Sequence, residues 1–270
     1  MDLNLPFSYT FIKKLDLGLT NNNYLIEMND EVYIVRMPIN DAIPSNRENE
    51  HAVLHAIKAL DFIIEPIYYK NGIQISHYYP QLITFDDYLS PERIIESARL
   101  MKKLHESNRT VEHHFNPVAM IHTYLKHTHN HRLHISVYND LFAQYASHQF
   151  TPVLCHNDWV AGNICFLDHK TYLIDFEYAG MNDPLFDVMS FITENDLSEG
   201  EKKLFLTQMV DDLSENNLQV LMMYRDLNNL LWYLWACMML EHRKDKIYAE
   251  IKAIKYKQLT MEYKQPLSFL

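Results

Sequence analysis

One stretch in the second half of the chain decides the fold. It reads Val153-Leu154-Cys155-His156-Asn157-Asp158-Trp159-Val160-Ala161-Gly162-Asn163-Ile164 and is followed by Tyr172-Leu173-Ile174-Asp175-Phe176-Glu177. Residues 164–167 and 171–174 are typical of strands, and Asp168-His169-Lys170 can form the turn between them. A three-residue turn centred on His169 would place Asn163 directly opposite Asp175, on one face of the ribbon.

The side chains at the open end of this hairpin favour phosphoryl transfer. Asn163 and Asp175 offer the oxygen ligands that Mg²⁺ takes together with substrate phosphates. Asp158 lies five residues before Asn163, near enough to accept a proton from a hydroxyl group. Each residue alone could be an ordinary turn former, but their joint spacing after His156 is that of kinase-like enzymes. We therefore expect Asp158, Asn163 and Asp175 to be catalytic, with Asn163 and Asp175 holding the metal.

Several further segments of the chain match the sequence pattern of one known family. They comprise residues 18–24, 156–164 and 174–180, Asp183-Pro184, Asp187, and the helix of Trp232 and Trp235. The chain resembles the choline/ethanolamine kinase branch of the aminoglycoside-phosphotransferase-like small-molecule kinases, in particular the bacterial choline kinases. The resemblance implies an α+β, two-lobed protein-kinase-like fold with ATP in the cleft, Mg²⁺ on Asn163 and Asp175, and Asp158 as the base. Asp187 and His156 are expected to steady the catalytic loop.

The pattern of apolar residues along the chain predicts two lobes of unequal size. Strand patterns dominate residues 5–37 and 63–79, with a helix expected over residues 47–60 between them. The rest of the chain is mainly helical apart from the quoted hairpin. We expect a small strand-rich ATP-binding lobe over residues 1–79 and a larger, mostly helical catalytic and substrate-binding lobe over residues 80–270.

A charged side chain in the small lobe is a candidate for the phosphates of ATP. A two-residue turn at Asn29-Asp30 would place Asn23 opposite Arg36. An arginine there could contact phosphate while it pairs with a carboxylate. The family resemblance implies Glu50 as that partner, with Glu48 as the alternative. A solvated charge at a strand end is the other interpretation of Arg36.

The loop before this strand has only one glycine, Gly18, among polar residues. Asparagine tolerates the left-handed backbone that phosphate-binding nests require. We therefore expect the nucleotide to be bound by residues of this polar stretch, Thr20, Asn21, Asn22 and Asn23, together with Arg36 and Glu50.

Aromatic residues in the second half are candidates for substrate binding. A quaternary ammonium cannot donate hydrogen bonds, so its recognition needs aromatic faces and a nearby carboxylate. Trp232 and Trp235 lie three residues apart and share one helix face. By resemblance, Tyr178, Glu194 and Tyr248 complete the site with them. The alternative is a buried core helix, the usual reason for an aromatic stripe.

Composition limits the possible partners. The 270 residues include 24 Lys+Arg and 35 Asp+Glu, a net charge of −11, which disfavours nucleic acid and anionic lipid as partners. The apolar run over residues 230–240 is shorter than the roughly 18–20 residues that cross a bilayer, so no membrane insertion is expected. The three cysteines are expected to be reduced, and the start of the chain lacks a basic signal-peptide region, so we expect a cytoplasmic protein.

The sequence therefore predicts an ATP-dependent choline kinase that makes phosphocholine and ADP. Two alternatives stay open. One is a kinase for another small cation, such as ethanolamine, thiamine or an aminoglycoside; the other is a non-catalytic module that binds a cationic ligand. The histidine-rich residues 113–134 are expected to form an exposed helix or loop, with a metal site as the alternative. No oligomeric state is predicted.

Overall fold

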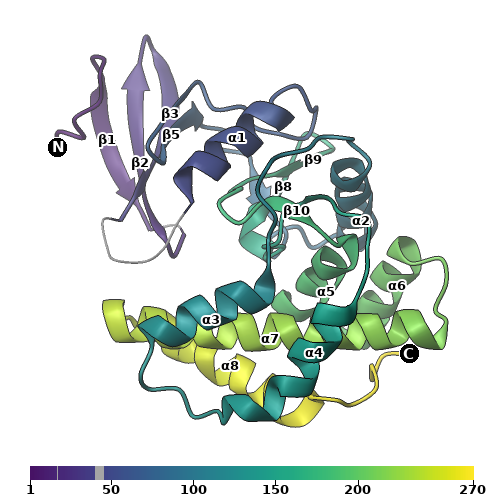
Figure 1. The fold of residues 1–270 in the computed structure, drawn as a ribbon. Helices are drawn as coiled ribbons and strands as arrows, with labels where there is room; N and C mark the ends of the chain where they lie inside the picture. Colours follow the sequence, from purple (N-terminus) through teal and green to yellow (C-terminus); the bar gives the residue numbers. More distant parts are fainter. Residues whose placement is uncertain (17, 40–45) are drawn as a thin grey trace.

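The computed structural model describes residues 1–16, 18–39 and 46–270. A five-stranded antiparallel sheet in the order β1-β2-β3-β5-β4 occupies the N-terminal part, and helices dominate the rest (Figure 1). The strands are β1 (Thr10–Leu15), β2 (Asn21–Met28), β3 (Glu31–Pro38), β4 (Tyr68–Lys70), β5 (Ile73–His77), β6 (Ile83–Thr84), β7 (Val153–Cys155), β8 (Ile164–Leu167), β9 (Lys170–Leu173) and β10 (Gly180–Asn182). The helices are α1 (Arg47–Ile57), α2 (Glu92–His105), α3 (Pro117–His127), α4 (Asn139–Ser147), α5 (Pro184–Glu194), α6 (Glu199–Met209), α7 (Glu215–Arg243) and α8 (Lys246–Glu262), with short 3₁₀ turns η1 (Ile135–Tyr138) and η2 (Ala161–Asn163). The predicted two-lobed fold class is confirmed; the division at residues 79 and 80 stays a prediction.

The first hairpin has the predicted register. Asn29 and Asp30 form its turn with φ of 51° and 64°, the left-handed values that two-residue hairpin turns require. Asn23 pairs with Arg36 as expected. Because side chains alternate along a strand, one face of the sheet carries Asn23 and Arg36. The other face packs a small core of Leu3, Tyr24, Ile26, Tyr33, Val35 and Ile75.

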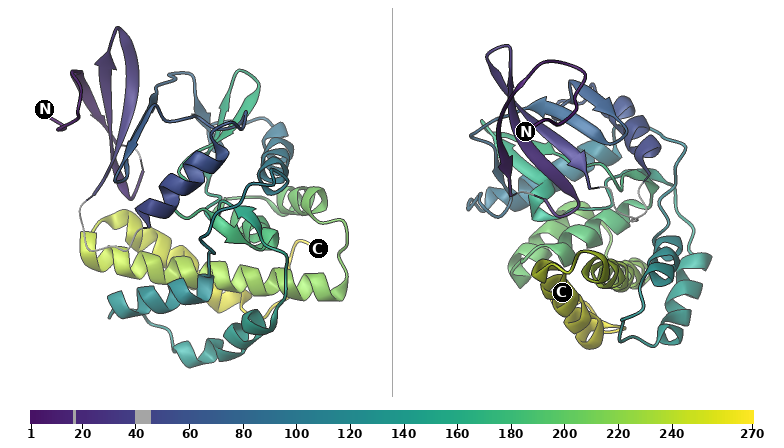
Figure 2. Two further views of the ribbon diagram at one scale, coloured as in Figure 1. Left: turned by 45° about the horizontal axis from the view of Figure 1, so that its top comes forward. Right: turned by 90° about the vertical axis from the view of Figure 1, so that its left-hand side faces the viewer.

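Helix α1 joins the sheet to the larger part of the molecule. Asn46 caps its N-terminus by accepting a hydrogen bond from the backbone N–H of Asn49 at 3.0 Å. Val53 and Ile57 are fully buried in the large core of the helical part. The helix ends at Ile57, three residues before the predicted end at residue 60. Figure 2 shows α1 between the sheet and the helices. Its buried residues belong to the larger core.

Helix α7 is the centre of the helical part. It packs against α3, α4, α5 and α8 (Figures 1 and 2), and residues 227–239 are buried along their whole length. A helix surrounded on all sides must be apolar all round, which explains the uninterrupted run over residues 230–240. No helix within the described part of the chain is both long and apolar enough to span a bilayer.

The register of the second hairpin differs from the prediction. Its turn has two residues, Asp168 and His169, with φ of 48° and 63°, so Lys170 belongs to β9 and pairs with Leu167. The prediction of a three-residue turn is therefore wrong, and Asn163 does not lie opposite Asp175. A two-residue turn with both residues left-handed matches the twist of paired strands better.

The observed register places Ile174 opposite Asn163, one residue before Asp175, and the chain bends just after this pair. The backbone N–H of Ile174 donates to the carbonyl of Asn163 at 3.0 Å, and Asp175 then adopts a left-handed φ of 65°. Such a conformation is uncommon for a residue with a side chain. It bends the chain at Asp175, whose carboxylate pairs with Arg36 of β3.

Asp187 of α5 holds the predicted catalytic loop, residues 156–163, as the sequence indicated. Its fully buried carboxylate accepts hydrogen bonds from the backbone N–H groups of His156 at 3.0 Å and Asn157 at 2.8 Å, and from His105 Nε2 at 2.9 Å. His156 in turn contacts the carbonyl of Ile174 through Nε2 at 2.9 Å. The loop and the segment after β9 are thereby fixed to one another.

Removing this carboxylate should strongly destabilise the fold. We expect Asp187→Ala to lower the free energy of unfolding by about 3–5 kcal/mol, because two buried N–H groups and His105 lose their acceptor. Urea unfolding followed by circular dichroism measures the change. Asp140→Ala is the control: its side chain is 84% exposed, so a change within about 0.5 kcal/mol is expected. Equal stability of the two variants would contradict the assignment.

Candidate active site

The catalytic loop fixes Asp158 through Asn163. The Asn163 amide nitrogen donates to the carbonyl and to the carboxylate Oδ2 of Asp158, both at 3.0 Å. Asn157, with a φ of 65°, turns the loop and donates to the carbonyl of Tyr178 at 2.9 Å. Both hydrogen bonds from Asn163 to Asp158 use the side-chain nitrogen of Asn163, so its side-chain oxygen could bind a cation.

Several negative charges act on Asp158. Burial, and then the charges of Asp175, Glu177 and Glu194, raise the pKa of Asp158 well above its usual range. Asn163 binds Asp158 with its side chain and Ile174, the residue before Asp175, with its carbonyl. The structure thus brings the three predicted catalytic residues, Asp158, Asn163 and Asp175, together. Burial and the charge of Asp175 also raise the pKa of Glu177, against the opposing effect of nearby arginines. A concentration of carboxylates of this kind attracts divalent and organic cations.

Arg36 connects this site to the sheet. Its guanidinium forms ion pairs with Glu50 of α1 and with Asp175. Burial opposes its charge, but the two carboxylates outweigh this and raise the pKa of Arg36. With a side chain only 11% exposed, Arg36 is not a solvated strand-end charge. The predicted partner Glu50 is the one the structure provides, whereas the alternative Glu48 is exposed.

The polar stretch before Arg36 forms a strand and not a nest. Asn21, Asn22 and Asn23 all pair in β2, and none of them has a left-handed φ. The expectation of left-handed asparagines is wrong because the ladder with β3 extends to the end of the strand. Alternation puts Asn21 and Asn23 on the face of Arg36 and Asn22 on the opposite face. Thr20 reaches the larger lobe, donating to Glu177 Oε1 at 3.0 Å.

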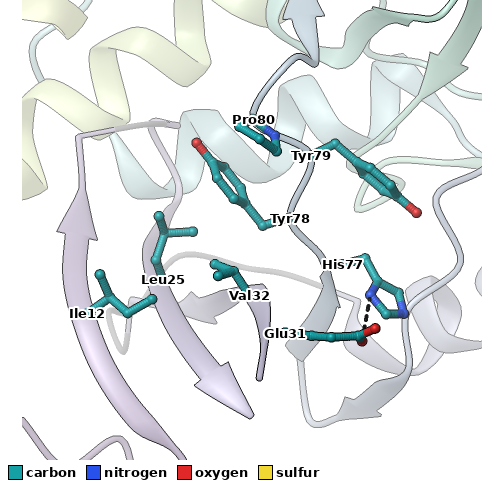
Figure 3. A pocket seen from close by; sticks show the side chains of 8 residues that line it. All are labelled: Ile12, Leu25, Glu31, Val32, His77, Tyr78, Tyr79 and Pro80. Atoms are coloured by element: carbon teal, nitrogen blue, oxygen red, sulfur yellow. Dashed lines mark ion pairs between the residues drawn. The ribbon is translucent and has the colours of Figure 1, made fainter. Parts of the chain in front are cut away.

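An apolar pocket of about 520 Å³ adjoins the sheet (Figure 3). Leu25 and Val32 line it from β2 and β3, and alternation puts both on the face that carries Arg36. Tyr78, Tyr79 and Pro80 line it from the segment that leaves β5 for the helical part, and Ile12 and the paired Glu31 and His77 complete the wall. Figure 3 shows the Tyr78 ring turned toward Leu25 and the Tyr79 ring turned away from it. The pocket is lined largely by apolar groups, which suits a flat heteroaromatic ring.

The predicted aromatic residues form one continuous row. Ring centroids lie 5.3 Å apart for Tyr178 and Trp232, 5.9 Å for Trp232 and Trp235, and 5.6 Å for Trp235 and Tyr248, all edge to face. The row begins beside the predicted catalytic loop, since the Asn157 side chain donates to the carbonyl of Tyr178 at 2.9 Å. Both tryptophans are largely buried, and their indole N–H groups have no hydrogen-bond partner.

Two functional candidates were missed by sequence reasoning. Glu177 lies two residues after Asp175 and is bound by Thr20 and by Arg47, at 3.4 Å; its spacing from Asp175 was the available signal. Lys255 pairs with the predicted Glu194, and the sequence offered no sign of this contact. The histidine-rich residues 113–134 form α3 and its flanking segments.

The fold and the site geometry are those of a kinase-like phosphotransferase. The chain belongs to the phosphotransferase enzyme family, whose family model matches residues 12–223. Protein LicA of Haemophilus influenzae is 24% identical over 245 residues, covering 83% of this chain and 72% of that protein. The crystal structure of choline kinase LicA from Streptococcus pneumoniae has a TM-score of 0.79 at 24% identity and covers 93% of this chain and 94% of that one. A structure of LicA in complex with AMP gives the same TM-score at 23% identity, over 95% and 94% of the two chains.

The aromatic row is tied to the loop before β2. The Tyr248 hydroxyl donates to the carbonyl of Leu19 at 2.7 Å, and Arg243 donates to the carbonyls of Leu19 and, at 3.4 Å, Thr20. The same tyrosine therefore contacts Trp235 with its ring and the small lobe with its hydroxyl.

Removing that hydroxyl should weaken nucleotide binding more than it disturbs the aromatic row. We expect Tyr248→Phe to raise the dissociation constant of ATP about 2- to 10-fold, the effect of one net hydrogen bond. Isothermal titration calorimetry measures it. Tyr263→Phe is the matched control, since its hydroxyl bonds the carbonyl of Val137. Unchanged ATP affinity in Tyr248→Phe would show that this contact does not position the loop.

Proposed function

We propose that the protein is an ATP-dependent choline kinase, which transfers the γ-phosphoryl group of ATP to the hydroxyl of choline and releases phosphocholine and ADP. The observation that carries this proposal is the row of four aromatic rings that leads from the catalytic loop. A quaternary ammonium binds to aromatic faces, and its attached hydroxyl would then be held near Asp158. The choline kinase LicA of Streptococcus pneumoniae, similar in fold over nearly the whole chain, supports this acceptor.

The nucleotide is assigned to the pocket of Figure 3 and to the polar residues beside it. The apolar walls at Leu25 and Val32 suit adenine. Arg36 lies on the same face of the sheet and would contact the phosphates, with Glu50 holding its guanidinium. Thr20, Asn21 and Asn23 line the approach, whereas Asn22 can contribute only its backbone. The LicA structure with AMP supports a nucleotide in this fold. We assign the reaction to the cytoplasm, where ATP is available.

The donor set fits a magnesium ion. Asn163 presents its amide oxygen and Asp175 a carboxylate, the hard ligands that Mg²⁺ prefers. These two residues would hold the ion, which when bound neutralises charge on the phosphates. Asp158 accepts the proton of the acceptor hydroxyl as the oxygen attacks phosphorus. Most of the rate enhancement is then positioning and electrostatic stabilisation, because phosphoryl transfer asks little covalent chemistry of the protein.

An acceptor panel tests the proposal directly. With ATP and Mg²⁺, we expect choline to be phosphorylated with a higher kcat/KM than ethanolamine, thiamine or an aminoglycoside, measured by coupled ADP release and mass spectrometry of the product. Asp158→Asn should lower kcat by about 10²–10⁴-fold, the usual contribution of a general base, with ATP binding retained. A preference for another acceptor would contradict choline as substrate. Cation binding without ATP consumption would show a non-catalytic binding module.

The rate should fall at acidic pH. Asp158 must be deprotonated to act as a base, so activity is present above its pKa and lost as pH falls through it. Because burial and three carboxylates raise this pKa, we expect the acidic limb of kcat/KM, measured with both substrates subsaturating, well above the ordinary aspartate value of about 3.9.

A matched variant separates this titration from that of ATP. Glu177→Gln removes one of the negative charges that act on Asp158, so its limb should move to lower pH, whereas the titration of ATP is the same for both proteins. Choline itself carries a permanent charge and does not titrate. A limb at the same pH in both proteins would assign it to another group.

A further inference from the structure

A buried lysine lies behind the predicted acceptor site. Lys255 is 2% exposed, and its ammonium pairs with Glu194 Oε1. It also donates to the carbonyl of Thr193 at 2.9 Å and to Asn229 Oδ1 at 3.3 Å. An ammonium has three donors, so all of them are occupied by these acceptors.

Lys255 and its partner Asn229 lie on the helix faces that carry the aromatic row. Asn229 precedes Trp232 by three residues on α7 and shares its face. On α8, Lys255 follows Tyr248 by seven residues, or about two turns, so both side chains face the same way. Glu194 is close enough for its charge to act on Asp158. Glu194 is thus held on one side by Lys255, between the aromatic row and the catalytic loop.

We infer that Lys255 determines acceptor specificity, because it occupies three hydrogen-bond acceptors that a primary ammonium could use, Glu194 Oε1, the Thr193 carbonyl and Asn229 Oδ1, and so favours a quaternary ammonium. This inference rests on the proposed function and narrows its substrate class. Lys255 is a positioning residue: it acts through Glu194 and does not contact the reacting atoms.

The physical basis is the different demand of the two cations. A primary ammonium such as that of ethanolamine is strongly hydrated and must replace water by hydrogen bonds when it enters the protein. Glu194 Oε1 already receives hydrogen bonds from Lys255 and from the Thr193 hydroxyl, the latter at 3.0 Å. A trimethylated ammonium donates none and is held by aromatic faces and by the remaining charge of Glu194. The resident lysine therefore disfavours ethanolamine more than choline.

Exchanging the lysine for an apolar side chain of similar length tests the inference. In Lys255→Met the three acceptors are released, so we expect the ratio of kcat/KM for choline to that for ethanolamine to fall at least tenfold relative to the wild type. Lys255→Arg, which keeps a cation beside Glu194, should restore most of the preference. Lys257→Met, an exposed position on the same helix, is the control and should leave the ratio unchanged.

The outcomes separate the two proposals. If both acceptors lose the same factor in Lys255→Met, the lysine has only a structural role and the inference is overturned. If the wild type itself does not prefer choline, the proposed function fails before any variant is compared. Should Lys255→Met not fold, the double variant Lys255→Met with Glu194→Gln removes the pair together, which buried pairs tolerate better. The ratio should again fall, and an unchanged ratio would overturn the inference.

Discussion

Four carboxylates lie close enough together for three of them to act on the fourth, Asp158, and the surrounding ion pairs offset that repulsion. They are Asp158, Asp175, Glu177 and Glu194, and their mutual effect is visible in the raised pKa of Asp158. Burial of like charges is costly unless each finds a partner. Three cations supply these partners, namely Arg36, Arg47 and Lys255. What remains is a site with excess negative charge, which suits a metal ion and an organic cation.

The same ion pairs hold the two lobes together. Arg36 and Arg47 come from the sheet and from α1, whereas their partners Asp175 and Glu177 follow β9. Arg243, at the end of α7, contacts the loop before β2. Polar contacts therefore supplement the apolar packing of α1 against the larger core. Nucleotide phosphates bound beside Arg36 would compete with Asp175 for its guanidinium.

Sequence reasoning went furthest where spacing and chemistry agreed. The pattern from His156 to Asn163, the register of Asn23 with Arg36 and the shared face of Trp232 and Trp235 needed only local rules. Tyr178 and Tyr248 were placed beside the tryptophans by the family resemblance. The predicted register of the second hairpin was wrong because the same sequence is compatible with a turn of two or of three residues. The choice between them depends on left-handed conformations at Asp168 and His169. Lys255 could not be found, because its partners come from α5 and α7 and meet only in the folded chain.

The proposed function requires a divalent ion and a quaternary ammonium to bind at two adjacent places beside Asp158. A crystal structure with Mn²⁺, a non-hydrolysable ATP analogue and choline tests it most directly. The account predicts an anomalous scattering peak within bonding distance of Asn163 Oδ1 and Asp175, and the trimethylammonium group against Trp232 and Trp235. Manganese bound away from both residues, or choline outside the aromatic row, would contradict it.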